Sequence, residues 1–271
     1  MEPEEEEDNN DLNDNLHLHL LSLSTTTTQP PPLRRPICPN CSRPGPVCLC
    51  HALPTQPIST TAQIIIVHHP HEARHKLSTT PVLTRCLANA TAIVTRRLRH
   101  GLSPLLDQSP PAIYLFPSSP DSSPAVTLSH LRHRPFDNHP SVVIAFDATW
   151  KHAREMVRAS EGFMSGFATR VCLGFDESTA GGSIYDSELV LRKEPFRGCV
   201  TTMEAVARTL AVVEPNGPEI EDRLVGVLRE MVRLQAGFLK PIKPRPKLAN
   251  NKGTAQKKMV AVGADEKSES S

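Results

Sequence analysis

Residues 142–150 read VVIAFDATW. The first five are apolar and rich in β-branched side chains, so they predict a short strand that is buried on both faces. Polar residues follow at once, with Asp147 and Thr149 directly after the apolar run. Strands buried on both faces belong to parallel sheets that have helices packed on each side. This stretch therefore predicts an α/β protein.

Three other short apolar runs repeat this pattern, at 62–67 (AQIIIV), 113–116 (IYLF) and 171–173 (VCL). Helical stretches lie between or after these runs. Thr201-x-x-Glu204 is a capping-box signature that opens one helix. The last predicted helix places a set of apolar residues on one face: Ile220, Leu224, Val227, Leu228, Met231, Leu234 and Phe238. The alternation predicts an α/β domain with a mostly parallel sheet and helices on both faces.

Each apolar run ends in a polar loop. The loops read VHHPHEARH, FPSSPDSS, DATWKHAR and GFDESTAGGS, in chain order. Turns are polar in any protein, so a single loop of this kind identifies nothing. In open α/β sheets, however, ligands bind outside the carboxyl ends of the strands. Four such loops therefore predict a ligand site at that edge of the sheet.

The net charge of +1 conceals an acidic start. Residues 1–14 hold eight acids and no base, which leaves 30 bases against 21 acids in the rest of the chain. Block charge of this kind is typical of a solvated tail. The basic remainder is nevertheless what a polyanion-binding surface requires, because phosphate contacts supply affinity that is independent of sequence.

The chain offers neither a membrane span nor a basic targeting peptide. No apolar run approaches the roughly 20 residues that a transmembrane helix needs, and the first residues, MEPEEEED, are acidic. Secretory and transit peptides begin with basic residues instead. We therefore expect a protein with no membrane partner, located in the cytoplasm, the nucleus or both.

Four of the seven cysteines cluster as Cys38-x2-Cys41-x6-Cys48-x-Cys50. Two close pairs of thiolates can converge on one zinc ion within a segment too short to form a core. His51 could replace one thiolate, and two disulfides are the competing interpretation, although nothing in the sequence indicates an oxidising compartment. A zinc ion with four protein ligands would serve folding or RNA docking. The other cysteines are expected in the core: Cys86, Cys172 and Cys199.

The composition divides the chain into four parts. Residues 1–33 are acidic and polar and predict a disordered tail. Residues 34–57 form the cysteine-rich zinc segment, and 58–239 form the α/β domain. Residues 240–271 begin with prolines alternating with bases, which predicts a flexible basic tail. That tail could contact RNA phosphates, direct nuclear import or remain merely solvated.

Taken alone, the tetrapeptide Asp147-Ala148-Thr149-Trp150 predicts only a helix N-cap and an aromatic core anchor. Several further motifs accompany it in order, and with them the chain, over about residues 36–239, resembles the DTW-domain family of tRNA-uridine aminocarboxypropyltransferases. The first matching group is the cysteine cluster with the histidine after it: Cys38, Cys41, Cys48, Cys50 and His51. An HPxExxR-type loop follows, one residue shorter than the family pattern: His69, Pro70, Glu72 and Arg74, with His75 as the alternative last position. The later motifs are Leu115–Ser118 (LxPS type), Asp147, Thr149 and Trp150 (DxTW), then Ser183, Tyr185, Leu191, Arg192, Lys193 and Pro195 with an interrupted spacing, and Thr201–Ala205 (STxEA type).

The resemblance implies a SPOUT-like α/β fold with a C-terminal knot. It implies S-adenosylmethionine (SAM) as donor of its 3-amino-3-carboxypropyl group and a tRNA uridine, in the D-loop, as acceptor. The uridine would be alkylated on the ring nitrogen between its carbonyls, and methylthioadenosine would be released. No metal is needed for this transfer, because the sulfonium already makes the donor carbon electrophilic.

The same resemblance implies roles for individual residues. Asp147 would accept the uridine proton or hold the ammonium group of SAM, Thr149 would cap the following helix, and Trp150 would brace the loop or stack on a base. The residues expected to bind SAM are Leu115, Pro117, Ser118, Tyr185 and Arg192, with Arg192 suited to a carboxylate. The residues expected to bind the RNA substrate are His69, Arg74, Thr202 and Glu204.

Two alternatives remain open from the sequence. A SAM-dependent RNA methyltransferase of the same broad fold would release S-adenosylhomocysteine instead of methylthioadenosine. A non-catalytic zinc-ribbon RNA-binding protein would not bind SAM, and removal of Asp147 would leave its RNA affinity unchanged.

Overall fold

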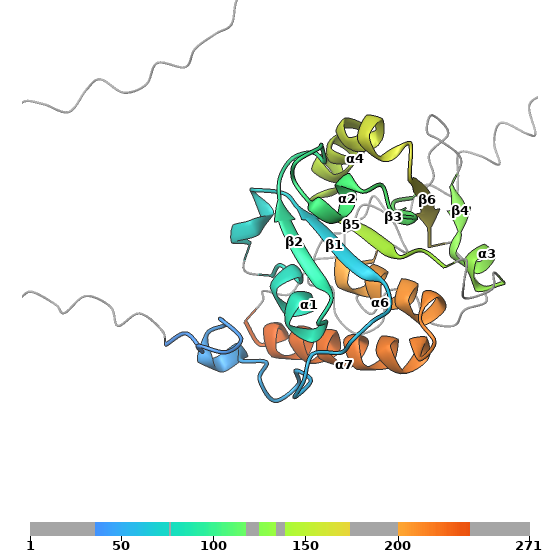
Figure 1. Cartoon of the computed structure of the whole chain (residues 1–271). Helices are drawn as coiled ribbons and strands as arrows, with labels where there is room; N and C mark the ends of the chain where they lie inside the picture. The colour runs from blue at the N-terminus through green and yellow to red at the C-terminus, as the bar shows by residue number, and fades with distance from the viewer. Residues whose placement is uncertain (1–35, 76, 118–124, 134–138, 174–199, 239–271) are drawn as a thin grey trace, which may run out of the picture. The chain divides into compact units, whose positions relative to one another are not determined.

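A computed structural model describes residues 36–75, 77–117, 125–133, 139–173 and 200–238 (Figure 1). Within these residues the strands form one six-stranded sheet with the order β2-β1-β5-β3-β6-β4, and every pairing is parallel. The strands are β1 (Gln63–His68), β2 (Ala90–Val94), β3 (Ala112–Leu115), β4 (Val126–Thr127), β5 (Val142–Asp147) and β6 (Ala168–Cys172). The predicted parallel α/β sheet is confirmed.

The four predicted apolar runs correspond to the four central strands, whereas β2 and β4 were not predicted. Both are edge strands with a neighbour on one side only. β2 leaves Thr91, Ala92 and Val94 exposed, and β4 has only two residues, both half-buried. An edge strand needs no continuous apolar run, because only part of it is covered. The sequence signal for a buried strand is therefore missing in both.

Helices cover both faces of the sheet, as predicted (Figure 1). Along β1, Ile64 and Ile66 point into one apolar layer and Ile65 and Val67 into the other. The first layer is covered by α1 (Thr80–Cys86), α3 (Leu128–Arg132), α6 (Thr202–Val213) and α7 (Gly217–Ala236). The second layer is covered by α2 (Pro104–Asp107) and α4 (Trp150–Met164). Two short 3-10 helices, η1 (Gly45–Val47) and η2 (Glu72–Arg74), complete the described elements.

The predicted apolar face of the last helix is largely confirmed. Its first five members are buried and Leu234 packs against the core at partial exposure. Phe238 is the exception, because α7 ends at Ala236 and the phenyl ring beyond it is 58% exposed. None of the described helices is both long and apolar enough to cross a membrane.

A buried carboxylate joins the end of α6 to the start of β1. Glu214, directly after α6, accepts hydrogen bonds from the backbone N–H of Thr61 at 2.8 Å and of Ala62 at 2.9 Å, and from the Thr61 hydroxyl at 2.9 Å. A buried charge is tolerated when hydrogen bonds replace its lost hydration. These three donors therefore fix where the helix layer meets the amino end of the sheet.

The turn between α6 and α7 leaves no room for a side chain at Gly217. A Cβ atom placed there would lie 2.5 Å from the carbonyl oxygen of Leu210 and also against that of Ala211. We expect Gly217→Ala to lower the free energy of unfolding by about 1–3 kcal/mol, as overpacking does. Gly226→Ala is the matched control in α7, because a Cβ there meets nothing within 4 Å, and it should add roughly 0.5–1 kcal/mol. Urea denaturation measures both; equal stability of the two variants would contradict this account of the turn.

Candidate functional site

The predicted site residue Asp147 is buried at the carboxyl end of β5, where the sheet register pairs it with His68 at the end of β1. Its carboxylate is surrounded by hydroxyl groups. Oδ2 accepts hydrogen bonds from Thr80 at 2.5 Å and Ser78 at 3.4 Å, and lies 3.4 Å from Nε2 of His68. Oδ1 accepts a hydrogen bond from the Thr202 hydroxyl at 2.7 Å. Both carboxylate oxygens are therefore engaged by the protein.

This arrangement brings several elements together at one carboxylate. The donors come from the loop before α1, from α1 itself and from the first residue of α6, while His68 belongs to β1. Thr202, which had been expected to bind the substrate, is thus bonded to Asp147. The predicted gathering of site residues at the carboxyl edge of the sheet is what the structure shows for β1, β5 and α6.

Thr149 and Trp150 begin α4 immediately after β5. Thr149 is the N-cap, and its hydroxyl accepts a hydrogen bond from the backbone N–H of His152 at 3.4 Å. The predicted capping role of Thr149 is therefore confirmed, and Asp147 is not the cap. The Trp150 ring lies 6.4 Å from the Phe116 ring, centroid to centroid, at 54°. Trp150 thus contacts the loop that follows β3, consistent with a bracing role.

Arg170 on β6 is a buried cation that the sequence did not point out. The residue is 4% exposed, its Nη2 donates to the carbonyl oxygen of Pro117 at 2.5 Å, and its guanidinium lies 5.1 Å from the Phe116 ring centroid. Its Nε and Nη1 atoms are buried and have no hydrogen-bond partner among the described residues. A buried charge without such partners is costly, which indicates that an anion or an acceptor group belongs here.

Three histidines meet beside Asp147. The backbone N–H of His69 donates to the carbonyl oxygen of Asp147 at 3.0 Å. The His69 and His152 rings stack at 4.2 Å with 10° between their planes, and the His71 ring lies edge-on to both. Burial, followed by the charges of His152, His71 and Arg96, lowers the pKa of His69, while Glu72 acts in the opposite direction. Of these three histidines, only His69 had been predicted as a site residue.

The remaining predicted residues have different settings. Leu115 is the buried last residue of β3, and Pro117 lies two residues beyond it. Glu204 is buried in α6 and accepts a bond from Arg208 at 2.7 Å, while Thr201 caps that helix by accepting the Glu204 N–H at 3.2 Å. Arg74 is the last residue of η2. Ser118, Tyr185, Arg192 and Cys199 lie outside the described residues, as does the connection 174–199 on which the predicted knot depends.

The residues that sequence reasoning missed carry no local signal. Arg170 stands in a strand pattern, and only the pairing of β6 with β3 places it against Phe116 and Pro117. His152 and Thr80 occupy ordinary helix positions. These residues reach the site because strands that are distant in sequence become neighbours in the sheet. The spacing of apolar residues along the sequence does not reveal which strands pair.

The four cysteines of the predicted zinc cluster converge. The Sγ atoms of Cys38 and Cys50 are 3.4 Å apart, those of Cys41 and Cys48 are 3.6 Å apart, and all four lie within 4.8 Å of one another. Tetrahedral zinc with bonds of about 2.3 Å places its sulfur ligands about 3.8 Å apart, so the cluster fits the ion. His51 instead bonds Oε1 of Glu230 on α7 at 2.7 Å, and the four thiols are free of disulfides.

The thiols of this cluster influence one another strongly. The backbone N–H of Cys41, followed by the Cys50 thiol, lowers the pKa of Cys38 to about 6. The neighbouring Cys38 in turn raises the pKa of Cys50 to about 12. A bound divalent metal would hold all four groups as thiolates.

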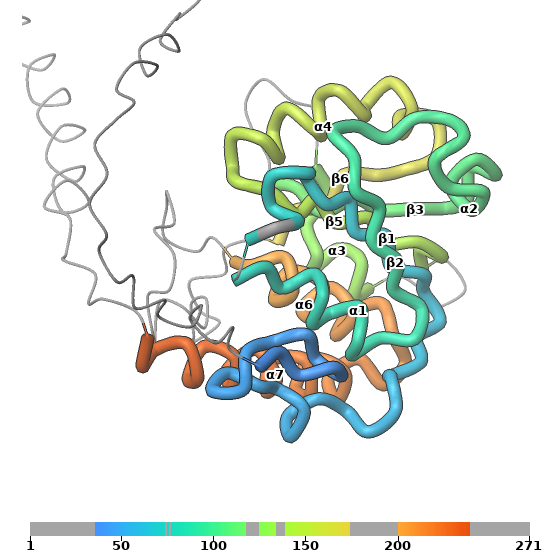
Figure 2. Tube along the Cα trace, turned by 90° about the vertical axis from the view of Figure 1, so that its left-hand side faces the viewer, coloured from blue at the N-terminus to red at the C-terminus, as the bar shows by residue number. Residues whose placement is uncertain are grey.

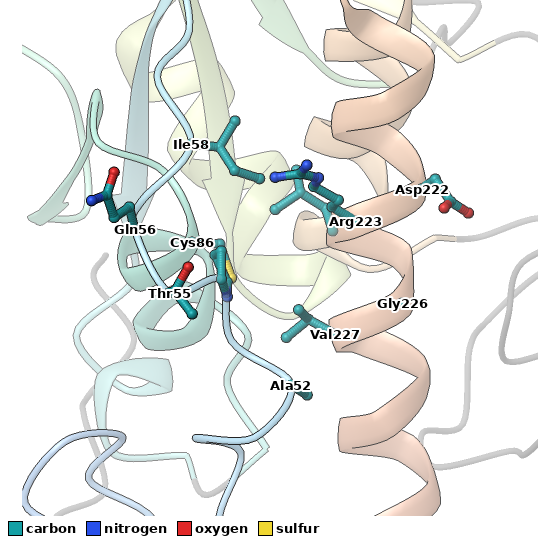
Figure 3. A pocket seen from close by; sticks show the side chains of 11 residues that line it. Ala52, Thr55, Gln56, Ile58, Cys86, Asp222, Arg223, Gly226 and Val227 are labelled. Atoms are coloured by element: carbon teal, nitrogen blue, oxygen red, sulfur yellow. The ribbon is translucent and has the colours of Figure 1, made fainter.

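The pocket in Figure 3 has a volume of about 620 Å³ and lies between the segment after the cysteines and α7. Ile58, Cys86 and Val227 contribute to its lining. None of the predicted site residues lines it. Burial raises the pKa of the Cys86 thiol to about 12, so this cysteine behaves as the core residue that the sequence predicted.

Comparison with known proteins agrees with the motifs. The model of the DTW domain matches residues 35–236. The chain is 59% identical over 231 residues to tRNA-uridine aminocarboxypropyltransferase A of Arabidopsis thaliana, covering 79% of this chain and 86% of that protein. It is 30% identical over 212 residues to tRNA-uridine aminocarboxypropyltransferase 2 of Drosophila melanogaster, covering 76% and 77%. No solved structure matches the chain. On this evidence the chain belongs to the DTW-domain family.

Proposed function

We propose that the protein transfers the 3-amino-3-carboxypropyl group of SAM to the ring nitrogen of a tRNA uridine. The observation that carries this proposal is the 59% identity to the Arabidopsis protein named tRNA-uridine aminocarboxypropyltransferase A, over 86% of that protein. The geometry supports it, because three separate sequence motifs meet at Asp147: the histidine loop, the DATW turn and the start of α6.

The test is mass spectrometry of nucleosides from tRNA incubated with the protein and SAM. We expect aminocarboxypropyl-uridine together with methylthioadenosine. S-adenosylhomocysteine and a methylated base would establish the methyltransferase alternative instead. Unchanged SAM and unmodified tRNA would support the non-catalytic RNA-binding alternative.

When bound, SAM supplies an electrophilic carbon next to its sulfonium. The uridine nitrogen forms the new N–C bond as the C–S bond breaks, methylthioadenosine leaves, and the proton of the ring nitrogen must go to a base. Asp147 is the carboxylate at the centre of the site, and Thr80 and Thr202 fix its two oxygens in place. It is assigned either to that proton or to the ammonium group of SAM, and the two roles predict different kinetics.

Asp147→Asn should lower the rate of transfer by about a hundredfold or more, because a charge at the reacting groups is lost. If Asp147 takes the proton, kcat falls in the variant and SAM affinity stays near that of the wild type. If Asp147 holds the ammonium group of SAM, SAM affinity falls as well. The amide must share bonds with the hydroxyls of Thr80 and Thr202, so we expect a stability loss of about 1–3 kcal/mol. Single-turnover kinetics and calorimetry with SAM measure these effects.

Thr202→Val is the companion variant, since it removes the bond to Oδ1 of Asp147 and preserves the side-chain shape. Thr209→Val controls for the stability of α6, because among the described residues Thr209 donates its hydroxyl within that helix, to the Ala205 carbonyl. We expect slower transfer in the first variant alone. Wild-type turnover in Asp147→Asn would show that the DATW turn is structural.

Arg170 is proposed as a ligand for the carboxylate of SAM, beside Pro117 of the predicted donor loop. Its burial and its two nitrogen atoms without a hydrogen-bond partner among the described residues, Nε and Nη1, support this role. Arg192, which had been assigned to the carboxylate, lies outside the described residues. We expect Arg170→Met to raise the Kd of SAM by about tenfold or more, as loss of a charge-assisted bond would. Arg170→Lys should recover part of the affinity. Weakened folding with unchanged SAM affinity would show that Arg170 only supports the Pro117 loop.

Zinc is proposed as the structural ion of the four-cysteine cluster. The segment that holds it packs against α7 (Figure 2), and Leu49 between two of the ligands is fully buried in the core. Loss of the ion should therefore weaken the packing of α7 as well as the cluster itself.

Metal analysis of protein purified without chelator should give about one equivalent of zinc. Cys38→Ser should lower that equivalent and the melting temperature together, and Cys86→Ala, which removes a thiol outside the cluster, should leave the zinc content unchanged. A metal-free preparation with full stability would rule out this assignment.

The proposed partners are tRNA and SAM, and the proposed location is the cytoplasm, the nucleus or both. The acidic and basic end segments, 1–33 and 240–271, are proposed to lie outside the catalytic domain 58–239 and the zinc segment 34–57. The match of the DTW model to residues 35–236 supports the two outer limits.

A further inference from the structure

We propose that His69, His71 and His152, together with Arg96, bind a phosphate group of the RNA beside the reacting centre. This inference rests on the proposed function, because it assigns a part of the substrate to a specific group of side chains. Of these four residues, only His69 had been expected from the sequence to bind the substrate. The cluster itself comes from the structure, since His152 belongs to α4 and Arg96 follows β2.

The three imidazoles form a compact set at the same sheet edge as Asp147. Each offers one ring nitrogen, and these nitrogens lie within 4.8 Å of one another. His69 is held next to Asp147 by its backbone bond of 3.0 Å. The hydroxyls bonded to the Asp147 carboxylate belong to α1 and α6 on one face of the sheet, whereas His152 belongs to α4 on the other face. A group bound by the histidines would therefore lie at the same edge of the sheet as Asp147 but on the other face.

The cluster is rich in potential positive charge and poor in negative charge. His71, His152 and Arg96 all disfavour a proton on His69, whereas the carboxylate of Glu72 favours it. These neighbouring cations repel a positive charge on the His69 ring. An anion among them removes that repulsion, so anion binding and protonation reinforce each other.

Ring nitrogens of His69 and His152 are available to an acceptor. Nδ1 of His69 accepts the backbone N–H of His71 at 3.3 Å, so Nε2 of the neutral ring carries the proton and can donate it. Nδ1 of His152 is buried and has no hydrogen-bond partner among the described residues. A buried polar atom left without a partner costs free energy, and an oxyanion would provide the missing acceptor once that ring nitrogen is protonated.

A shared metal ion fits this geometry poorly. A metal ligated by imidazole lies close to the plane of the ring, where the nitrogen lone pair points. The His69 and His152 planes differ by only 10° and their centroids are 4.2 Å apart. Two nearly parallel, stacked planes have no common point near both nitrogens, so one ion cannot be ligated well by both rings.

A phosphate of RNA fits better than a single small carboxylate because the positive surface continues outward. His71 and Arg96 are exposed, and Arg97 and Arg99 are exposed next to them. None of these three arginines forms an ion pair within the described parts of the chain. The buried Leu98, whose N–H donates to Ser160 of α4 at 2.9 Å, fixes the basic segment to the domain. A chain of successive phosphates matches such a row of cations.

The experiment measures tRNA affinity between pH 6 and 8 at constant ionic strength, and then salt dependence at fixed pH. Burial and the neighbouring cations lower the pKa of His69 in the free protein, and a bound phosphate would favour its protonated form. Affinity should therefore be highest at low pH and fall as the pH rises through the pKa of His69 in the complex. We expect wild-type tRNA binding to be about tenfold tighter at pH 6 than at pH 8.

The double variant His71→Gln/His152→Gln should lose most of this pH dependence, and Arg96→Gln should reduce the slope of log affinity against log salt by about one. His130→Gln is the matched control, because His130 is an exposed histidine on α3, next to β4 at the far edge of the sheet. It should keep the wild-type pH profile. A double variant with the wild-type pH profile overturns the proposal.

Two further measurements distinguish phosphate binding by the histidine cluster from binding of the SAM carboxylate or of a metal ion. If SAM affinity falls in the double variant and tRNA affinity does not, the cluster binds the donor carboxylate and the phosphate assignment is wrong. If zinc or nickel added alone binds in a second equivalent that the double variant loses, the cluster is a metal site and the assignment is wrong. If transfer itself is absent but the pH-dependent tRNA binding behaves as expected, the proposed function fails and this site remains.

Discussion

The buried carboxylate of Asp147 is the constraint to which the rest of the site is adjusted. A charge taken out of water needs hydrogen bonds from its surroundings, and here Thr80, Ser78 and Thr202 provide them. These donors come from parts of the chain far apart in sequence, so the carboxylate fixes the starts of α1 and α6 at the end of β5. The sheet register adds His68 from β1. Motifs that look unrelated along the sequence are thereby joined at one point.

The sequence predicted those parts of the molecule whose signal is local. The strand β5 is visible because its apolar run is short, β-branched and followed by polar residues, and the four cysteines are visible because their spacing alone allows them to converge. The cap at Thr149 follows from its place between strand and helix. In each case the information lies within a few neighbouring residues. The parallel α/β class could be inferred for the same reason.

What could not be predicted depends on which strands become neighbours. Arg170 is a buried cation only because β6 packs beside β3, and His152 meets His69 only because α4 starts next to the end of β1. The edge strands β2 and β4 lack apolar runs since one side of each is open. Phe238 was placed on a buried face because the helical pattern was extended past the true end of α7. The spacing of apolar residues indicates whether a segment is a helix or a strand, but it does not indicate which other element that segment packs against.

The helix α6 is fastened at both of its ends by carboxylates. At its first residue, Thr202 is bonded to Asp147 at the carboxyl edge of the sheet, and just after its last residue Glu214 is bonded to Thr61 and Ala62 at the opposite edge. One inserted residue would lengthen a helix by about 1.5 Å and rotate everything beyond it by about 100°. One of the two attachments, at Asp147 or at Thr61 and Ala62, would then be lost. α6 therefore acts as a spacer of fixed length, and an insertion or deletion within this helix would break the connection between the two ends of the sheet.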